Sequence, residues 1–125
     1  MRDGQTILIV DNDGDVADSL TVELRRLGYT VLRTNKPLKA LKAFQSDPTA
    51  WHAVVSDDLM PPMRGLELLR RMKRIRPDLK TVLCTDNRDI LKTEPAARKA
   101  ADATCVKPID AKEIGFLLKV LFQTP

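Results

Sequence analysis

Polar side chains able to take part in chemistry follow four short apolar runs of the chain. Two runs are followed by carboxylates, a third by a hydroxyl and a carboxylate, and a fourth by an ammonium. In chain order, the residues that follow the four runs are Asp11, Asn12, Asp13 and Asp15; Ser56, Asp57 and Asp58; Thr85 and Asp86; and Lys107 with Pro108. Clustered carboxylates repel one another, and a hard cation such as Mg²⁺ relieves that repulsion through oxygen ligands. A carboxylate beside Mg²⁺ can attack a phosphoryl group, while a hydroxyl and an ammonium stabilise the phosphoryl oxygens. If these residues meet in space, the pattern indicates phosphoryl chemistry.

The elements that must position these residues begin with five predicted strands. Residues 7–10 are four consecutive apolar residues, three of them β-branched, which is typical of a strand buried on both faces. Further strands are predicted over residues 29–33, 53–55, 81–85 and 103–106.

Helical patterns alternate with the predicted strands. Their apolar positions recur at helical spacing, with Gly28 as a stop, Pro37 and Asp110 as starts and Pro77 beyond an end. The inward sets are Val16, Leu20, Leu24 and Leu27; Leu38, Leu41 and Phe44; Leu68 or Leu69, Met72 and Ile75, from a start near Gly65; and Ile114, Leu117, Leu118 and Leu121. Between residues 86 and 101, Pro95 predicts a short, bent or late-starting helix.

Strict alternation of strands and helices predicts an α/β fold, a doubly wound parallel sheet with helices on both faces. Right-handed crossovers leave a few arrangements of the five strands. In such sheets the working site lies beyond the carboxyl ends of the strands, where the polar residues named above stand.

The length of 125 residues is near the usual size of one globular domain, so we expect a single domain over residues 1–125. A composition of 43% hydrophobic and 30% charged residues is typical of a soluble fold. The apolar runs are too short to cross a bilayer, and the first residues do not resemble a signal peptide. Cys84 and Cys105 lie inside apolar segments, which favours buried, reduced thiols. We therefore expect a cytoplasmic protein without membrane contact.

The net charge of +4 raises the question of nucleic acid. The cations concentrate in two stretches: Lys36, Lys39 and Lys42, then Arg64, Arg70, Arg71, Lys73, Arg74, Arg76 and Lys80. With one Trp and one Tyr, the chain offers no aromatic stacking platform. A solvated helix face explains the charges more simply, and we predict no direct nucleic-acid contact.

Over essentially its whole length the sequence resembles the response-regulator receiver domains of two-component signalling. The segment from Asp57 to Gly65 carries the family's spacing, an aspartate followed by Met60-Pro61, then Met63, then glycine. An apolar run ending in Asp11, a strand ending in Thr85 and the Lys107-Pro108 pair complete the pattern in the family's order.

The resemblance implies a flavodoxin-like sheet with strand order 2-1-3-4-5 and a phosphoacceptor at Asp57. The phosphoryl group would come from a phosphohistidine of a histidine kinase or histidine phosphotransfer protein. Mg²⁺ would be held by Asp11, Asn12, Asp57 and the backbone carbonyl of Leu59. Lys107 would pair with the phosphoryl group, Thr85 would carry the switch, and the bond before Pro108 would be the family's cis peptide. The only catalysis implied is phosphorylation and dephosphorylation of the chain itself, and a homodimer is an open expectation.

Four positions depart from the family pattern. Asn12 replaces one of two adjacent acids, which predicts weaker Mg²⁺ binding, with Asp13 as a substitute ligand if the loop turns it inward. Asp86 stands where a small residue is usual, and either repels the phosphoryl donor or points to solvent. Thr104 replaces an aromatic residue and cannot make the aromatic swing that reports phosphorylation. Ser56, directly before Asp57, is a milder departure.

Two alternatives remain open at this point. The departures are compatible with a receiver-like module that binds partners without being phosphorylated. The run from Asp11 to Val16 also resembles the first motif of haloacid-dehalogenase-type phosphatases, with Asp11 as nucleophile. That family needs a further acidic pair after its lysine, whereas Asp110 and Glu113 have the spacing of a helix cap.

Overall fold

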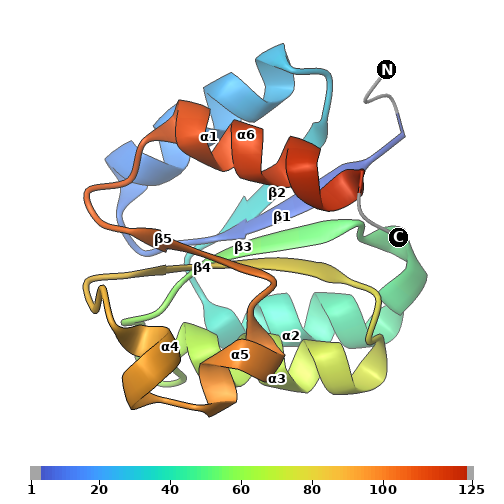
Figure 1. The fold of residues 1–125 in the computed structure, drawn as a ribbon. Coiled ribbons are helices and arrows are strands. Elements are labelled where there is room, and N and C mark those ends of the chain that lie inside the picture. Colours follow the sequence, from blue (N-terminus) through green and yellow to red (C-terminus); the bar gives the residue numbers. More distant parts are fainter. Residues whose placement is uncertain (1–3, 124–125) are drawn as a thin grey trace.

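Short apolar runs form a parallel sheet in the computed structural model, which describes residues 4–123 (Figure 1). The predicted single domain over residues 1–125 extends at its ends into residues 1–3 and 124–125, which lie outside the described residues. The strands are β1 (Thr6–Val10), β2 (Thr30–Thr34), β3 (Ala53–Asp57), β4 (Lys80–Thr85) and β5 (Ala103–Val106). Their order is β2-β1-β3-β4-β5, so the predicted fold class and strand order are confirmed.

Helices cover both faces of this sheet, as Figure 1 shows. One face carries α1 (Gly14–Arg26) and α6 (Ala111–Phe122). The other carries α2 (Pro37–Ser46), α3 (Gly65–Ile75), α4 (Ile90–Thr93) and α5 (Ala96–Ala100), and a short 3-10 helix η1 (Pro48–Ala50) precedes β3. The arrangement follows from crossovers that pack each helix back onto the sheet.

The core has two parts because alternate strand residues face opposite helical layers. Leu8, Val10 and Val54 pack with residues of α2, α3 and α5. Ile7 and Ile9 pack on the other face with residues of α1 and α6. Burial on both faces explains why β1 and β3 are nearly continuous apolar runs rather than alternating ones.

Local signals set several helix ends. The Asp13 carboxylate caps α1 by accepting the backbone N–H groups of Asp15 and Val16. After α1, Gly28 takes the left-handed conformation with φ of 98°, which favours glycine. The Asp110 carboxylate caps α6 by accepting the N–H of Lys112.

Two predicted core positions are wrong. Leu38 on α2 is 48% exposed and Ile75 at the end of α3 is 44% exposed. In α2 the inward stripe runs through Ala40, Leu41 and Phe44 instead. Pro37, in the same first turn as Leu38, is buried on that stripe, so Leu38 lies to one side of it. Ile75 is the last residue of α3, three residues past Met72, the final buried position of that helix.

The stretch between β4 and β5 holds two short helices, α4 and α5, in agreement with the break predicted at Pro95. Pro95 is the residue before α5, and its missing N–H falls where a helix start needs no donor. Glu94 links the two pieces: its N–H donates to the carbonyl of Ile90, and its carbonyl accepts the N–H of Ala97.

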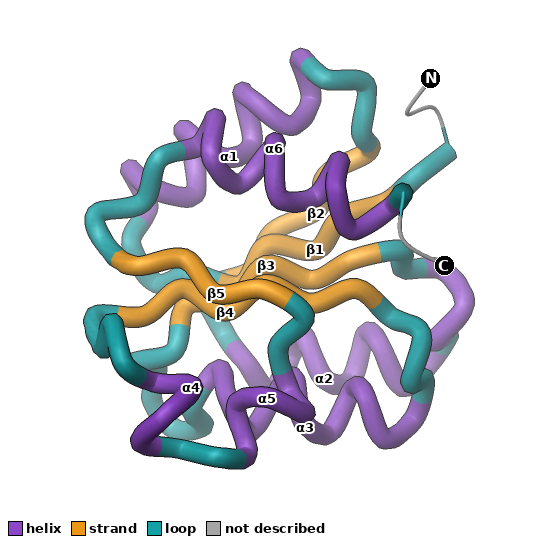
Figure 2. Tube along the Cα trace, in the orientation of Figure 1, coloured by secondary structure: helices purple, strands orange, loops and turns teal. Residues whose placement is uncertain are grey.

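Loops that leave the strands gather at one edge of the sheet, seen on the left in Figure 2. These loops contain the polar residues on which the sequence motif rests. Over residues 4–123, the helices are all too short or too polar for a membrane span.

Candidate functional site

The strand register brings the motif residues of four strands to the same edge. Val10 pairs with Ser56, so Asp11 and Asp57 follow at the same level of the sheet. On the other side of β3, Asp57 pairs with Cys84, and Thr85 pairs with Val106. The ends of β1, β3, β4 and β5 therefore meet, as parallel topology requires.

Asp57 and Lys107 form an ion pair at the centre of this edge. Lys107 Nζ lies 2.6 Å from Asp57 Oδ1, and the Asp57 side chain is only 3% exposed. The contact falls outside hydrogen-bond geometry, and no group among residues 4–123 donates a hydrogen bond to Asp57 Oδ1. The ion pair therefore holds the Asp57 carboxylate by charge and leaves the hydrogen-bonding capacity of Oδ1 unused.

Asp11 is the second buried carboxylate of the site, at 7% exposure. Burial raises the pKa of Asp11, and the charge of Asp57 raises it further, while the hydrogen bond from the Asp13 N–H, at 2.8 Å, opposes the rise. This is the mark of two carboxylates held close in a poorly solvated place. A cation between them would remove the repulsion.

The neighbouring carboxylates also raise the pKa of Lys107, and here the shift favours the charged form. Burial disfavours its ammonium, but contact with Asp57 and the charges of Asp57, Asp86 and Asp11 outweigh burial and raise the pKa of Lys107. Lys107 is therefore a fixed positive charge at neutral pH. Asp86 is exposed, yet its charge acts on the site ammonium.

Thr85 lies at the end of β4 with 3% exposure. Its hydroxyl accepts the N–H of Asn87 at 3.0 Å, and its carbonyl accepts the N–H of Lys107 at 2.9 Å. The peptide bond between Lys107 and Pro108 is cis. Thr85 thus links the end of β5 to the loop that leads into α4.

The donors at this edge fit one divalent cation. Asp11 and Asp57 are buried carboxylates, and the pKa of Asp11 is raised chiefly by burial and in smaller part by the charge of Asp57. Asn12 and Leu59 lie exposed in the two adjoining loops. Asp13 is exposed too, with its carboxylate engaged in capping α1. Over residues 4–123, no three side chains among His, Cys, Asp and Glu are placed together as metal ligands. The set is two carboxylates plus neutral oxygens, a chemistry suited to Mg²⁺ with water completing the shell.

Asp58, which the sequence grouped with the other strand-end carboxylates, has a structural role instead. It is 3% exposed, its Oδ1 accepts the N–H of Leu66 at 3.0 Å, and its Oδ2 pairs with Arg64 Nη2 at 2.6 Å. Its partners lie six and eight residues away across two prolines, beyond any local spacing rule. Pro61–Pro62 in this loop is also cis.

Gly65 allows the loop to close against β3. A Cβ at this position would lie 2.0 Å from the Asp57 carbonyl oxygen and 2.8 Å from Ser56 Oγ. The Ser56 hydroxyl in turn donates to the Asp57 carbonyl at 2.9 Å. Only glycine permits this approach. Ser56, a departure from the family pattern, therefore fills a buried place beside the glycine.

Thr104 is half-buried in β5, with Leu83 as its neighbour in β4. Its small side chain cannot swing between an inward and an outward position as an aromatic ring can.

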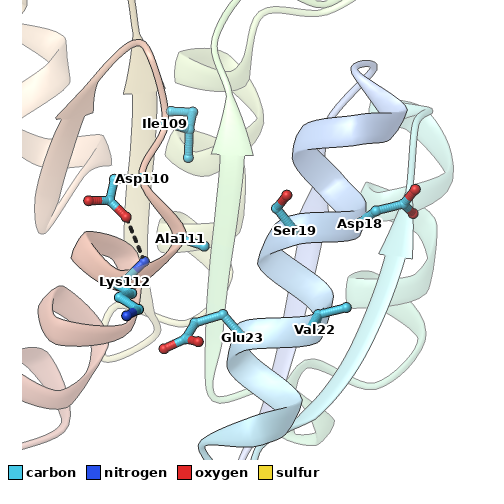
Figure 3. A pocket seen from close by; sticks show the side chains of 8 residues that line it. All are labelled: Asp18, Ser19, Val22, Glu23, Ile109, Asp110, Ala111 and Lys112. Carbon is cyan, nitrogen blue, oxygen red and sulfur yellow. Dashed lines mark hydrogen bonds between the residues drawn. The ribbon is translucent and has the colours of Figure 1, made fainter.

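A shallow pocket of about 660 Å³ lies next to the site, between α1 and the start of α6 (Figure 3). Asp18, Val22 and Glu23 line it from α1, and Ile109 and Lys112 line it from the segment after Lys107. The pocket does not contain Asp57. The pocket is therefore separate from the cluster of Asp11, Asp57 and Lys107.

Comparison with known proteins places the chain in a family. The model of the response regulator receiver domain matches residues 7–119. The transcriptional regulator NtrC of Azospirillum brasilense is 34% identical over 109 residues, which are 87% of this chain and 22% of that protein. The response regulator MprA of Mycobacterium ulcerans is 30% identical over 117 residues, 94% of this chain and 50% of MprA.

Solved structures agree with these relatives. The response regulator TrrA of Thermotoga maritima, in complex with Mg²⁺ and BeF, superposes with a TM-score of 0.82 at 28% identity and covers 94% of this chain and 98% of TrrA. A receiver domain from Clostridium thermocellum superposes with a TM-score of 0.84 at 22% identity, covering 95% and 94% of the two chains, which shows the shared fold. This chain spans about a quarter of the length of several relatives, with 22% of NtrC and 28% of PgtA covered. The strand-end cluster, the sheet order and the match over residues 7–119 together show that the chain belongs to the response regulator receiver domain family of two-component signalling.

Proposed function

We propose that Asp57 is the phosphoacceptor of this receiver domain. The observation that carries the proposal is the ion pair between the buried Asp57 carboxylate and Lys107, with the buried carboxylate of Asp11 near enough for its charge to be felt at both. Asp58, by contrast, is occupied by a helix N-terminus and an arginine. The two neighbouring aspartates thus have separate tasks.

In the proposed reaction an Asp57 carboxylate oxygen attacks the phosphorus of a phosphohistidine. The new P–O bond forms as the P–N bond breaks, and the donor imidazole leaves with the electron pair of that bond. Lys107 stays within reach of the transferred oxygens and balances their charge. The Thr85 hydroxyl would exchange its bond with the Asn87 N–H for a contact with the phosphoryl group.

Mg²⁺ is the proposed cofactor, held by Asp11, Asp57, the Leu59 carbonyl and the Asn12 amide oxygen. When bound, it neutralises charge on the phosphoryl oxygens and on the attacking carboxylate. The TrrA structure was determined with Mg²⁺ and BeF, which supports such a site in a related protein. With a neutral Asn12, this chain would bind the cation more weakly than a receiver with three acids.

The proposed phosphoryl donor is a histidine kinase or a histidine phosphotransfer protein. A protein donor must bring an imidazole to the open edge of the sheet, beside the pocket between α1 and α6. Exposed Val22, at 70%, and the apolar Ile109 give this surface an apolar element that a helix of the donor could cover. Location in the cytoplasm, where such kinases act, is part of the same proposal.

Intact mass spectrometry after incubation with a small-molecule phosphodonor tests the phosphoacceptor. Wild type with Mg²⁺ should gain one phosphoryl group, and wild type with a chelator should gain none. Asp57→Asn should gain none in either condition, while Asp58→Asn should retain some uptake. A phosphoryl group that survives Asp57→Asn would refute the proposal.

The unphosphorylated interaction module and the haloacid-dehalogenase-type phosphatase predict different results in that experiment. A module would show no uptake by wild type, and the phosphatase would use Asp11. Asp11 accepts the Asp13 N–H within its own loop, and the Asp13 carboxylate caps α1. These contacts and the family membership favour the phosphoacceptor function.

A further inference from the structure

Arg64 joins two segments that are thirty residues apart in sequence. Its Nη2 lies 2.6 Å from Asp58 Oδ2, and its Nη1 lies 2.7 Å from Glu94 Oε1, with a third bond of 3.0 Å from Nη2 to Glu94 Oε2. The guanidinium thus pairs with both oxygens of one carboxylate and one oxygen of another. A planar fork with fixed donors makes such a bridge, and a lysine cannot.

On one side, the bridge closes the loop of residues 58–65 that follows Asp57. The Asp58 carbonyl accepts the N–H groups of Met60 and Gly65, at 3.2 and 2.9 Å, and its carboxylate accepts the N–H of Leu66. Leu59, whose carbonyl is the proposed Mg²⁺ ligand, lies within this closed loop. Arg64 pairs with Asp58 Oδ2, the carboxylate oxygen that Leu66 leaves free, so both oxygens of Asp58 hold the loop.

On the other side, the bridge grips the junction of α4 and α5. The backbone N–H of Glu94 donates to the carbonyl of Ile90 in α4, and the Glu94 carbonyl accepts the N–H of Ala97 in α5, so the residue that Arg64 holds is bonded to both short helices. Contacts with Glu94 first, and then with Asp58, raise the pKa of Arg64, so the bridge is fully charged at neutral pH.

We propose that Arg64 is a positioning residue for the phosphorylation site: it holds the loop that presents the Leu59 carbonyl and ties that loop to α4 and α5 through Glu94. The inference rests on the proposed phosphoacceptor function and adds a route by which occupancy of the site reaches α4 and α5. Such a route is needed because Thr104 supplies no aromatic side chain for the purpose. The direction in which Mg²⁺ affinity changes when Arg64 is removed separates a positioning role from a purely electrostatic one.

Removal of a cation near an anionic pocket should tighten the binding of Mg²⁺ if only charge matters. If Arg64 positions the loop, its removal should weaken Mg²⁺ binding instead. Arg71 is the matched control, because it is an exposed arginine on α3 whose partner Glu67 keeps a second partner in Arg70. Arg71→Ala removes the same charge and leaves the loop intact.

The test follows backbone amide signals by ¹⁵N NMR during titration with Mg²⁺, and then with Mg²⁺ and beryllofluoride. Arg64→Ala should raise the Kd for Mg²⁺ about fivefold, whereas Arg71→Ala should leave it unchanged or slightly lower. Arg64→Lys, which can pair with Asp58 but cannot span both carboxylates, should restore Mg²⁺ affinity. Glu94→Gln should also keep Mg²⁺ affinity within about twofold.

The amides of residues 90–100 report the second part of the proposal. In wild type, beryllofluoride should shift these signals, and in Arg64→Lys and Glu94→Gln the shifts should be lost although the ligand binds. An Arg64→Ala variant that binds Mg²⁺ as tightly as Arg71→Ala would overturn the positioning role. Unchanged shifts in Glu94→Gln would overturn the coupling.

A failure of the phosphoacceptor function itself would look different. Wild type would then show no shift of the Asp57 amide with beryllofluoride, whatever residue stands at position 64. If Arg64→Ala does not fold, Arg64→Lys and Glu94→Gln still decide the coupling, and amide hydrogen exchange without any ligand supplies a further measurement. The amides of Glu94 and Ala97 should exchange faster in Glu94→Gln than in Arg71→Ala, and equal rates would contradict the bridge.

Discussion

Lys107 Nζ lies 2.6 Å from Asp57 Oδ1, so an ion pair spans the ends of β5 and β3 across the intervening strand β4. Because β3 and β5 each pair with β4 and not with each other, this ion pair is a direct side-chain link between their ends. It also places a positive charge directly beside the buried carboxylate of Asp57, the proposed phosphoacceptor.

Loss of the Lys107 ammonium should destabilise the fold, because it leaves Asp57 buried with an unpaired charge. Lys107→Met should lower the free energy of unfolding by about 2 kcal/mol at neutral pH. Chemical denaturation measures the change, with Lys112→Met on the exposed start of α6 as the control. If the destabilisation comes from Asp57, the added change Asp57→Asn should remove most of it. A double variant as unstable as Lys107→Met would show another cause.

Asp11 should reduce stability when no cation is bound. Burial and the charge of Asp57 raise the pKa of Asp11 above its ordinary value of 3.8, so the folded state binds that proton more tightly than the unfolded state. The free energy of unfolding therefore falls as the pH rises through the window from 3.8 to the raised pKa. Asp11→Asn keeps the acceptor for the Asp13 N–H and should gain about 1 kcal/mol at neutral pH with chelator present.

The same substitution should remove the stabilising effect of added Mg²⁺. Melting curves with Mg²⁺ and with chelator, for wild type and Asp11→Asn, separate the two effects. Wild type should melt higher with Mg²⁺, and the variant should melt at one temperature in both conditions. A variant less stable than wild type in chelator would contradict repulsion between the two carboxylates.

Asn12 should limit the affinity for Mg²⁺. Asn12→Asp adds a carboxylate at the exposed end of β1 and should lower the Kd for Mg²⁺ about tenfold, equivalent to about 1.4 kcal/mol. Calorimetric titration of both proteins gives the comparison, and Asp15→Asn at the nearby start of α1 controls for general charge. Equal affinities for wild type and Asn12→Asp would show that position 12 does not contact the cation.

Gly65 and Gly14 make a matched pair for the loop after Asp57. A methyl at position 65 would collide with the Asp57 carbonyl, whereas no atom lies within 4 Å of a Cβ at position 14. Gly65→Ala should destabilise by about 3 kcal/mol or more, and Gly14→Ala should be neutral or stabilise by up to about 1 kcal/mol. Thermal melts of the two variants check this, and a mild effect at position 65 would mean that the loop has room to move.

Much of the fold follows from local pattern. Buried strands such as β1 and β3 are continuous apolar runs, and the alternation of strands with helices leaves few sheet orders, so the edge that carries Asp11, Asp57, Thr85 and Lys107 could be foreseen. Pro95 also marked the break between α4 and α5. These features depend on residues near in sequence or on general rules of parallel sheets.

Other features depend on contacts that sequence spacing does not encode. Arg64 lies in the loop after β3, and Glu94 lies at the junction of α4 and α5, which follow the neighbouring strand β4. The sequence of neither segment indicates that these two residues pair. Asp58 is the same residue type as Asp57 and directly follows it, but its carboxylate accepts the N–H of Leu66 and pairs with Arg64, which gives it a structural role. Leu38 and Ile75 have helical spacing, yet Leu38 lies to one side of the buried stripe of α2, and Ile75 is the exposed last residue of α3.

The most direct test of the central claim is to locate the acyl phosphate itself. After incubation with Mg²⁺ and a small phosphodonor, borohydride reduces an aspartyl phosphate to homoserine, and peptide mass mapping then identifies the changed position. Homoserine at position 57 is the predicted result. Homoserine at position 11, or at neither position in a protein that has taken up phosphate, would contradict the account.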